Sequence, residues 1–217
     1  VAGGLLSLGI PAFKLPRGIV ARRVKLLEDA GVRFALGISV GKDVAWRDLA
    51  NEFDAVFAGT GAARPVTLDL PGADNASVMT ADVFLRAVAA KDWKLPDASF
   101  PIETLKGRRV SVLGGGDTAL DCARTAVRLG AASVSLVARR AKDALRARPS
   151  DLARAETEGV SLLCGRTFSS LSISPDGTLN GLALRNVANP DEPSETLPAD
   201  VVIVAYGFRP VPDGELQ

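Results

Sequence analysis

The chain has 217 residues, of which 47% are apolar, and it carries 26 basic residues against 25 acidic ones. This composition predicts a soluble globular chain of one or two domains. The balanced charge leaves no excess to neutralise a nucleic-acid backbone, and no apolar stretch approaches the roughly 20 residues of a membrane-spanning helix. We therefore expect neither a nucleic-acid partner nor a membrane partner.

The first residues and the residue types bear on location and chemistry. The opening segment, VAGGLLSLGIPAFKLP, lacks a basic region and runs into Gly and Pro, so we expect no signal peptide and a cytoplasmic protein. The absence of histidine removes imidazole bases and His-ligated zinc from consideration. Cys122 and Cys164 have no C-x-x-C partner, which favours buried thiols over a dithiol relay. We predict no metal site and no catalytic side chain.

Residues 1–62 contain one helical pattern and two strand-like patterns. Apolar residues at near-helical spacing, followed by Gly31 as a left-handed cap, predict a helix at about 17–30. The alternating run VRFALGISV predicts a strand within 32–40. The apolar run FDAVFAGTGA predicts another strand at 53–62, ending in a tight turn.

The middle of the chain alternates helical and strand patterns. The segment TADVFLRAVAAK predicts a helix that Thr80 caps, with its apolar residues on one stripe. Residues 91–106 contain two prolines and are predicted to form a loop. After this loop we expect a strand at 109–113, a helix at 117–129 closed by the following glycine, and a strand at 133–138.

The last third adds a second cycle of elements. RPSDLARAETEG predicts a helix that Ser150 or Asp151 caps and Gly159 ends, and VSLLCG predicts a strand after it. The run at 168–187 alternates on both sides of an Asp-Gly dipeptide, which predicts an antiparallel hairpin. The continuous apolar run at 199–207 is typical of a buried parallel strand. The order predicts an α/β fold, a Rossmann-like three-layer NAD(P)-binding domain with a β-ribbon excursion.

Three small residues stand between the strand at 109–113 and the helix after it. Gly114, Gly116 and Ala119 form the pattern G-x-G-x-x-A, in the context that a dinucleotide fingerprint requires. Gly114 permits the sharp turn, Gly116 lets the backbone approach a pyrophosphate, and Ala119 lets the helix pack closely on the sheet. A glycine-rich turn that only redirects the chain is the alternative.

Two arginines end the next predicted strand. At this position a carboxylate binds the ribose hydroxyls of NAD, whereas an arginine accommodates the 2′-phosphate of NADP. Arg139 and Arg140 therefore predict NADPH, although a solvated basic pair is the alternative. Arg146 and Arg148 lie just beyond and could contribute, but each alone is typical of a surface charge.

Several segments resemble one family in order. LKGRRVSVLGGGDTALDCARTAVRLGA, VARR and ARPSDLARAETEGV are similar to the NADPH-dependent glutamate synthase small-subunit family, which includes the nucleotide-binding part of dihydropyrimidine dehydrogenase. GGLLSLGIPAFKLPRGIVARRVKLLEDAGVRF and LPADVVIVAYGFRP resemble two further segments of that family, so the similarity covers nearly the whole chain.

The resemblance implies FAD-binding segments and iron–sulfur cysteines that are not found in this sequence. We therefore expect a piece of a longer protein, with part of an FAD-binding domain at 1–64, an NADPH-binding domain at 65–208, and the return to the FAD domain at 209–217. FAD would belong to the intact protein, and iron–sulfur clusters only to missing regions or to a partner. Gly3, Gly4, Gly59, Thr60 and Gly61 resemble flavin-lining positions, but we make no prediction from them.

The resemblance also implies site residues for NADPH. Asp121 corresponds to an acid near the nicotinamide carboxamide and Gly207 to a glycine beside the nicotinamide, although a helix-surface aspartate and a strand-end turn would look the same. The predicted cofactor-binding residues are Gly114, Gly115, Gly116, Asp117, Thr118, Ala119, Asp121, Arg139, Arg140 and Gly207.

These observations and the resemblance together predict a function. We expect the NADPH-binding portion of a flavin-dependent oxidoreductase, which passes hydride from NADPH to FAD and electrons to a large-subunit or other acceptor partner. Hydride transfer needs orientation more than an acid or base, so the absence of histidine fits it. The alternatives are a non-catalytic NADPH-sensing or interaction module and a free-standing dehydrogenase.

Overall fold

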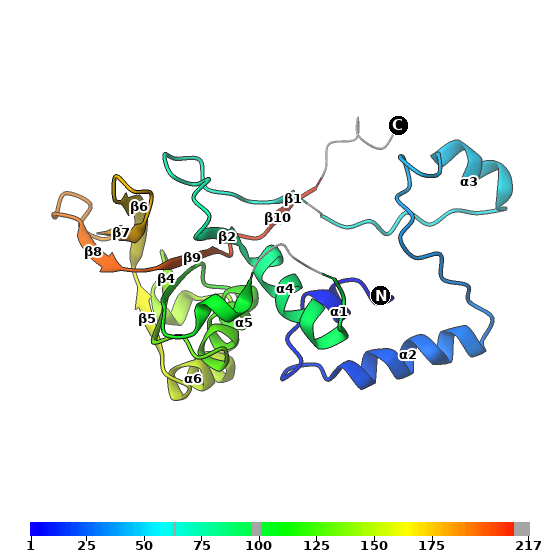
Figure 1. The fold of residues 1–217 in the computed structure, drawn as a ribbon, viewed down its shortest axis with the longest axis horizontal. Coiled ribbons are helices and arrows are strands. Elements are labelled where there is room, and N and C mark those ends of the chain that lie inside the picture. Colours follow the sequence, from blue (N-terminus) through cyan, green and yellow to red (C-terminus); the bar gives the residue numbers. More distant parts are fainter. Residues whose placement is uncertain (63, 97–100, 211–217) are drawn as a thin grey trace.

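A five-stranded parallel sheet organises the computed structural model, which describes residues 1–62, 64–96 and 101–210. The strands lie in the order β2 (Val78–Thr80), β9 (Val201–Val204), β3 (Arg109–Leu113), β4 (Ser133–Ala138) and β5 (Val160–Cys164). Helices α4 (Ala81–Trp93), α5 (Asp117–Arg128) and α6 (Pro149–Thr157) lie on one side of this sheet (Figure 1). The repeated strand–helix–strand order confirms the predicted Rossmann-like α/β fold.

Side chains along the central strands point alternately to the two faces of the sheet and divide the core into two layers. Val112 and Leu136 belong to the cluster that packs against the helices. Leu113 and Val137, one position further along the same strands, belong to a second cluster on the opposite face. Successive strand residues point to opposite faces of a sheet, so a strand that is apolar at every position must be covered on both sides. This requirement explains the third layer.

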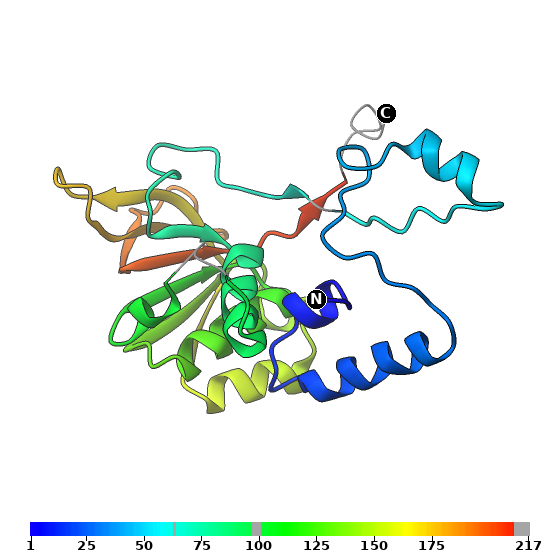
Figure 2. The same ribbon diagram turned by 45° about the vertical axis from the view of Figure 1, so that its right-hand side comes forward.

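A three-stranded antiparallel ribbon forms that layer, built from β6 (Arg166–Ile173), β7 (Leu179–Asn186) and β8 (Glu195–Pro198) (Figure 2). Leu182 and Leu184 of β7 are buried in the second cluster. The turn between β6 and β7 contains Gly177 at φ 84°, a left-handed conformation suited to glycine. The predicted hairpin is confirmed, whereas β8 was not predicted.

The first 62 residues are organised differently. They form α1 (Leu5–Leu8), α2 (Arg17–Asp29) and α3 (Trp46–Glu52), joined by extended segments. The predicted helix at 17–30 is confirmed by α2. The strands predicted within 32–40 and 53–62 are wrong, because neither segment forms a strand and both are exposed along their length. A strand needs a neighbour for its backbone N–H and C=O groups, and no strand in the described ranges pairs with them.

Two short strands connect the N-terminal region with the sheet domain. β1 (Arg64–Pro65) pairs antiparallel with β10 (Phe208–Arg209), and the Val66 amide donates to the Gly207 carbonyl at 2.9 Å. Figure 1 shows the two strands side by side between the sheet domain and α3. Residues 211–217, within the predicted return segment, lie outside the described residues, and the boundaries at 64 and 208 stay predictions.

Details at helix ends differ from the prediction. Thr80 holds the N-cap position of α4 but its side chain makes no capping hydrogen bond. Arg148 occupies the N-cap position of α6 without a side-chain capping hydrogen bond, and Pro149 lies in the first turn, so neither Ser150 nor Asp151 is the N-cap. Proline suits the first helical turn because its missing N–H has no partner there.

Two short 3₁₀ helices complete the helices of the described residues. The predicted loop at 91–106 overlaps the end of α4 and contains η1 (Ile102–Leu105), while its residues 97–100 lie outside the description. The second 3₁₀ helix, η2 (Lys142–Ala144), lies between β4 and α6. No helix in the described ranges is long and apolar enough to cross a bilayer.

Candidate cofactor-binding site

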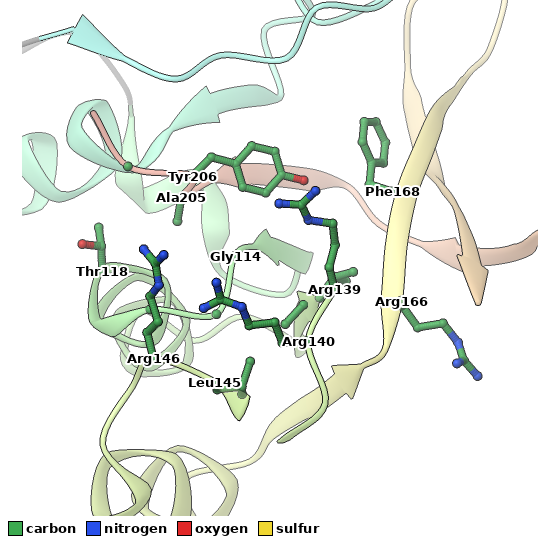
Figure 3. A pocket seen from close by; sticks show the side chains of 15 residues that line it. Gly114, Thr118, Arg139, Arg140, Leu145, Arg146, Arg166, Phe168, Ala205 and Tyr206 are labelled. Atoms are coloured by element: carbon green, nitrogen blue, oxygen red, sulfur yellow. The ribbon is translucent and has the colours of Figure 1, made fainter. Parts of the chain in front are cut away.

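A pocket of about 310 Å³ lies where β3, β4 and β9 end at their carboxyl sides (Figure 3). In open parallel sheets, ligands bind outside these strand ends. The turn after β3, the ends of β4 and β9, the segment after η2 and the first residues of β6 contribute the walls. The lining residues are Gly114, Gly115, Gly116, Thr118, Val137, Ala138, Arg139, Arg140, Leu145, Arg146, Arg166, Phe168, Ala205, Tyr206 and Gly207.

The first and third glycines of the turn after β3 serve different purposes. Gly114 adopts φ 144°, and a Cβ at this position would lie 2.5 Å from the carbonyl oxygen of Ala205. Gly116 has φ −106°, and a Cβ there would meet nothing within 4 Å. The fold itself therefore requires glycine at 114. At 116 the protein leaves open space, which a close-lying ligand would need.

The turn leads directly into α5. Gly116 is the N-cap of this helix, and its carbonyl accepts hydrogen bonds from the amides of Ala119 and Leu120. The first amides of a helix have no acceptor within it and carry the positive end of the helix dipole, which suits an anion. Ala119 is fully buried beneath the turn, 3.3 Å from the position of a Gly114 Cβ. This close packing is what the small residue was predicted to allow.

Three guanidinium groups face the pocket. Arg139 and Arg140 follow β4, and Arg146 follows η2 with its side chain toward Thr118 (Figure 3). Within the described part of the chain, none of the three has a carboxylate within ion-pair distance, and no Asp or Glu is among the lining residues. The pocket is therefore positively charged, which suits a ligand with several negative charges.

Tyr206 supplies a polar group on the β9 side. Its hydroxyl lies beside the Arg139 guanidinium in Figure 3. Partial burial raises the pKa of the Tyr206 hydroxyl, and the positive charge of Arg139 opposes this rise. Since the net shift is upward from a value near 10, the phenol keeps its proton at neutral pH and can donate a hydrogen bond.

Two of the predicted acidic residues lie elsewhere. Asp117 is exposed in the first turn of α5 and does not line the pocket. Asp121 is buried, and its Oδ1 lies 2.7 Å from Nζ of Lys14, which is itself 3.9 Å from Asp151. Burial raises the pKa of the Asp121 carboxyl, while Lys14 lowers it. In this structure Asp121 joins the N-terminal segment to α5, and its contact with a nicotinamide stays a prediction.

Sequence reasoning did not assign several lining residues to the site. Arg146 had only its clustering with other arginines as a signal, and its place depends on the short helix η2 before it. Arg166 and Phe168 belong to the ribbon, whose packing over the strand ends carries no local signature. A weak signal existed, because β6 follows the carboxyl end of β5 and such ends gather at one edge of a parallel sheet.

Comparison with known proteins identifies the family. The profile of the pyridine nucleotide-disulphide oxidoreductases matches residues 14–217. The chain belongs to this family. It is 38% identical to the glutamate synthase (NADPH) small chain of Halomonas elongata over 97% of its own length and 47% of that protein. The resemblance to glutamate synthase small chains is thereby confirmed, and the chain spans about half the length of this relative.

The chain is also similar to a subunit of a different enzyme and to a solved structure. The NADP(+)-dependent formate dehydrogenase subunit beta of Moorella thermoacetica is 32% identical over 95% of this chain and 30% of that protein. Among solved structures, Mycobacterium tuberculosis FprA in complex with NADPH superposes with a TM-score of 0.74 and 20% identity, covering 96% of this chain and 62% of FprA. This second likeness supports the fold.

Proposed function

We propose that the chain is the NADPH-binding portion of a flavin-dependent oxidoreductase that resembles the glutamate synthase small subunit. The observation that supports this most directly is the pocket itself, in which an open glycine turn and a helix start face three guanidinium groups without carboxylate partners. The names of relatives at 32–38% identity, glutamate synthase (NADPH) small chain and NADP(+)-dependent formate dehydrogenase subunit beta, point to the same nucleotide.

The residues that line the pocket suit successive parts of NADPH. The turn at Gly116 and the first amides of α5 suit the pyrophosphate, because a Cβ is missing where the backbone must approach it. Arg139 and Arg140 are placed to bind the 2′-phosphate at the end of β4, with Arg146 as a third cation on the same wall. Among the residues that the structure describes, no Asp or Glu lines the pocket, which disfavours NADH, because a carboxylate usually holds its ribose hydroxyls.

The chain's own part in the reaction is binding and orientation. Bound NADPH would supply a hydride equivalent from its nicotinamide ring, which a flavin of the intact protein would accept. The phosphate contacts would hold the pyrophosphate and the adenosine half of the cofactor, so the strand-end residues around Gly207 would set where its reactive ring can lie. The positions that resemble flavin-lining residues, Gly3, Gly4 and 59–61, are all exposed, and we derive no step through them.

Electron transfer to a large subunit or another acceptor belongs to the same proposal. The names of the relatives, a glutamate synthase small chain and a formate dehydrogenase subunit, describe subunits of different enzymes. The final acceptor therefore depends on regions beyond the nucleotide pocket.

The decisive experiment removes the two arginines after β4. The double change Arg139→Ala and Arg140→Ala should weaken NADPH binding by roughly thirty- to a hundred-and-fifty-fold, because two screened charge-assisted contacts are together worth about 2–3 kcal/mol. NADH has no 2′-phosphate, so it should lose far less affinity than NADPH. Calorimetric titration of both nucleotides measures the two effects.

A matched control exists in α2. Arg22 and Arg23 are also adjacent and exposed, and neither lines the pocket, so Arg22→Ala with Arg23→Ala changes the net charge equally. This control should leave both affinities within about twofold, since charges beyond a Debye length are screened. Equal losses of NADPH and NADH in the test variant would contradict the assignment of the 2′-phosphate site.

A further inference from the structure

One wall of the pocket comes from outside the parallel sheet. Phe168 lies on β6, the first strand of the antiparallel ribbon, and it lines the pocket beside the arginines that follow β4. The phosphate-binding turn follows β3, the arginines follow β4, and β6 continues from the end of β5. A ligand that runs along these strand ends from β3 toward β5 has its phosphates first and its 2′-phosphate next. The part of the ligand beyond the 2′-phosphate would then lie against Phe168.

The strand geometry holds the Phe168 ring firmly in that wall. The ladder between β6 and β7 pairs Phe168 with Leu184 and then shifts register before Ser170. Such an irregularity re-aims a side chain and is common beside binding sites. The ring is half-buried and packs against the ribbon-side core cluster, and the hydroxyl of Ser169 donates to the Ala183 carbonyl at 3.1 Å. The ring therefore loses little freedom when a ligand meets it.

Backbone hydrogen bonds fix the spacing between the two walls. The Gly165 amide, at the junction of β5 and β6, donates to the Arg140 carbonyl at 3.1 Å. The Gly165 carbonyl in turn accepts from the Val187 amide at 2.9 Å. The segment after β4 and the start of the ribbon are thus tied together. Figure 3 shows the Arg139 guanidinium between Tyr206 and Phe168.

We propose that Phe168 and Arg139 form a clamp for a planar base, the adenine ring of NADPH. This inference rests on the proposed function and assigns the half of the cofactor that carries no reacting atom. An aromatic face stacks on any nucleobase, and the guanidinium plane of arginine stacks in the same way. Since Phe168 offers no hydrogen-bonding group, the clamp recognises the plane of the base and not its edge.

The test distinguishes binding through the aromatic face of Phe168 from binding through the volume of its side chain. Phe168→Leu keeps an apolar side chain against the ribbon core but removes the ring face. Adenosine 2′,5′-bisphosphate carries the adenine and the 2′-phosphate without nicotinamide. We expect Phe168→Leu to weaken both this fragment and NADPH by the same factor, about tenfold, because loss of one stacking contact accounts for that much. Phe168→Tyr, which keeps the ring, should restore most of the affinity.

Two controls accompany this test, a comparison at low and high salt and a variant of a neighbouring residue. The factor lost in Phe168→Leu should be equal at low and high salt, since stacking is not screened, whereas displacement of Arg139 would make it shrink as salt rises. Leu171→Ala alters a ribbon residue that packs on the same core but does not line the pocket. It should lower stability and leave both affinities unchanged.

The outcomes distinguish this inference from the proposed function. Wild-type affinity of Phe168→Leu for the bisphosphate, or a loss confined to NADPH, would overturn the clamp while the NADPH site stands. If the unchanged chain bound neither nucleotide, the proposed function would fail and the clamp with it.

Discussion

The N-terminal region, residues 1–62, and the domain built on the parallel sheet are held together by different forces. In the first region only Ser7, Pro11 and Val20 are buried, and Phe57 is 95% exposed. The sheet domain instead buries two continuous apolar clusters, one on each face. Burial of apolar area is the main source of folding free energy. The sheet domain is therefore stable through its own core, and the N-terminal region depends on what it touches.

The contacts that attach the N-terminal region to α5 are mostly polar. The Phe13 ring lies 3.9 Å from the guanidinium carbon of Arg128 and 4.7 Å from that of Arg124. Both arginines bind Glu158 at the end of α6, and the next residue of the segment, Lys14, pairs with Asp121. Charges and cation–π contacts respond to pH and salt, while an apolar core responds far less. We therefore expect changes of pH and salt to weaken the attachment of the N-terminal region more than they weaken the core of the sheet domain.

The largest effect should follow from breaking the sheet domain at its glycine turn. Gly114→Val forces a β-branched residue into φ 144° and against the Ala205 carbonyl. Backbone strain and overpacking together should lower the free energy of unfolding by about 3–5 kcal/mol. Urea denaturation followed by circular dichroism measures the loss.

The neighbouring turn position provides the contrast. Gly116→Val meets no atom and needs no unusual φ, so it should cost about 1 kcal/mol, mainly as a poorer N-cap, while abolishing NADPH binding. Equal stability losses in the two variants would contradict the separate roles of these glycines.

A smaller effect should follow from breaking the attachment of the N-terminal region. Lys14→Met leaves the Asp121 carboxylate buried without its partner, which for a fully buried pair costs 3–5 kcal/mol. Because the Lys14 side chain is 22% exposed, we expect about 2 kcal/mol. Hydrogen-exchange protection of the α1 amides should fall about thirtyfold, while that of β3 should not change.

The pH dependence of this variant has a definite sign. Burial already raises the pKa of Asp121, and loss of Lys14 raises it further. The protection deficit should therefore be largest at pH 8 and shrink as the pH falls and the carboxyl takes up a proton. Adding Asp121→Asn should restore much of the protection. An equal deficit at every pH would show that the lysine acts through packing and not through charge.

The smallest effect concerns the arginine pair under Phe13. Arg128 and Arg124 lower the pKa of Glu158 from 4.5 to about 2. A carboxyl with a lowered pKa in the folded state adds stability above about pH 4.5, and this is lost as the pH falls toward 2. Solvent screening reduces the contribution to about 1 kcal/mol.

Acid titration of stability checks this prediction. Wild type should lose this increment between pH 4.5 and 2 in urea denaturation, and Glu158→Gln should lack it at every pH. Glu156→Gln removes a single exposed ion pair with Lys142 and serves as the control, with little expected change. A wild-type profile that runs parallel to that of Glu158→Gln would count against the paired state of Glu158.

The same difference between regions explains what the sequence could predict. Helix α2 forms as expected, because a helix satisfies its backbone hydrogen bonds within itself. The segments 32–40 and 53–62 have strand-like patterns, yet a strand forms only beside another strand, and a local pattern does not contain that partner. In the sheet domain each strand finds neighbours, so the local patterns and the fold agree.

The candidate site likewise contains residues that the sequence could predict and residues that it could not. The glycine turn and the arginines after β4 belong to one contiguous strand–turn–helix–strand unit, so their spacing alone predicted that they meet. Phe168 and Tyr206 reach the pocket from later strands, and only the packing of the ribbon and the placement of β9 beside β3 bring them there. Asp121 is a different case, because a lysine more than a hundred residues earlier holds its carboxylate, and its contact with a nicotinamide stays a prediction.

The pairing of β1 with β10 brings the two ends of the sheet domain together. The chain enters at Val66 and leaves at Gly207, two residues that share a backbone hydrogen bond. A segment whose ends lie side by side can be cut out, circularised or spliced into a surface loop of another protein without stretching its fold. Recombination at these two points would move the whole pocket from one chain to another in one step.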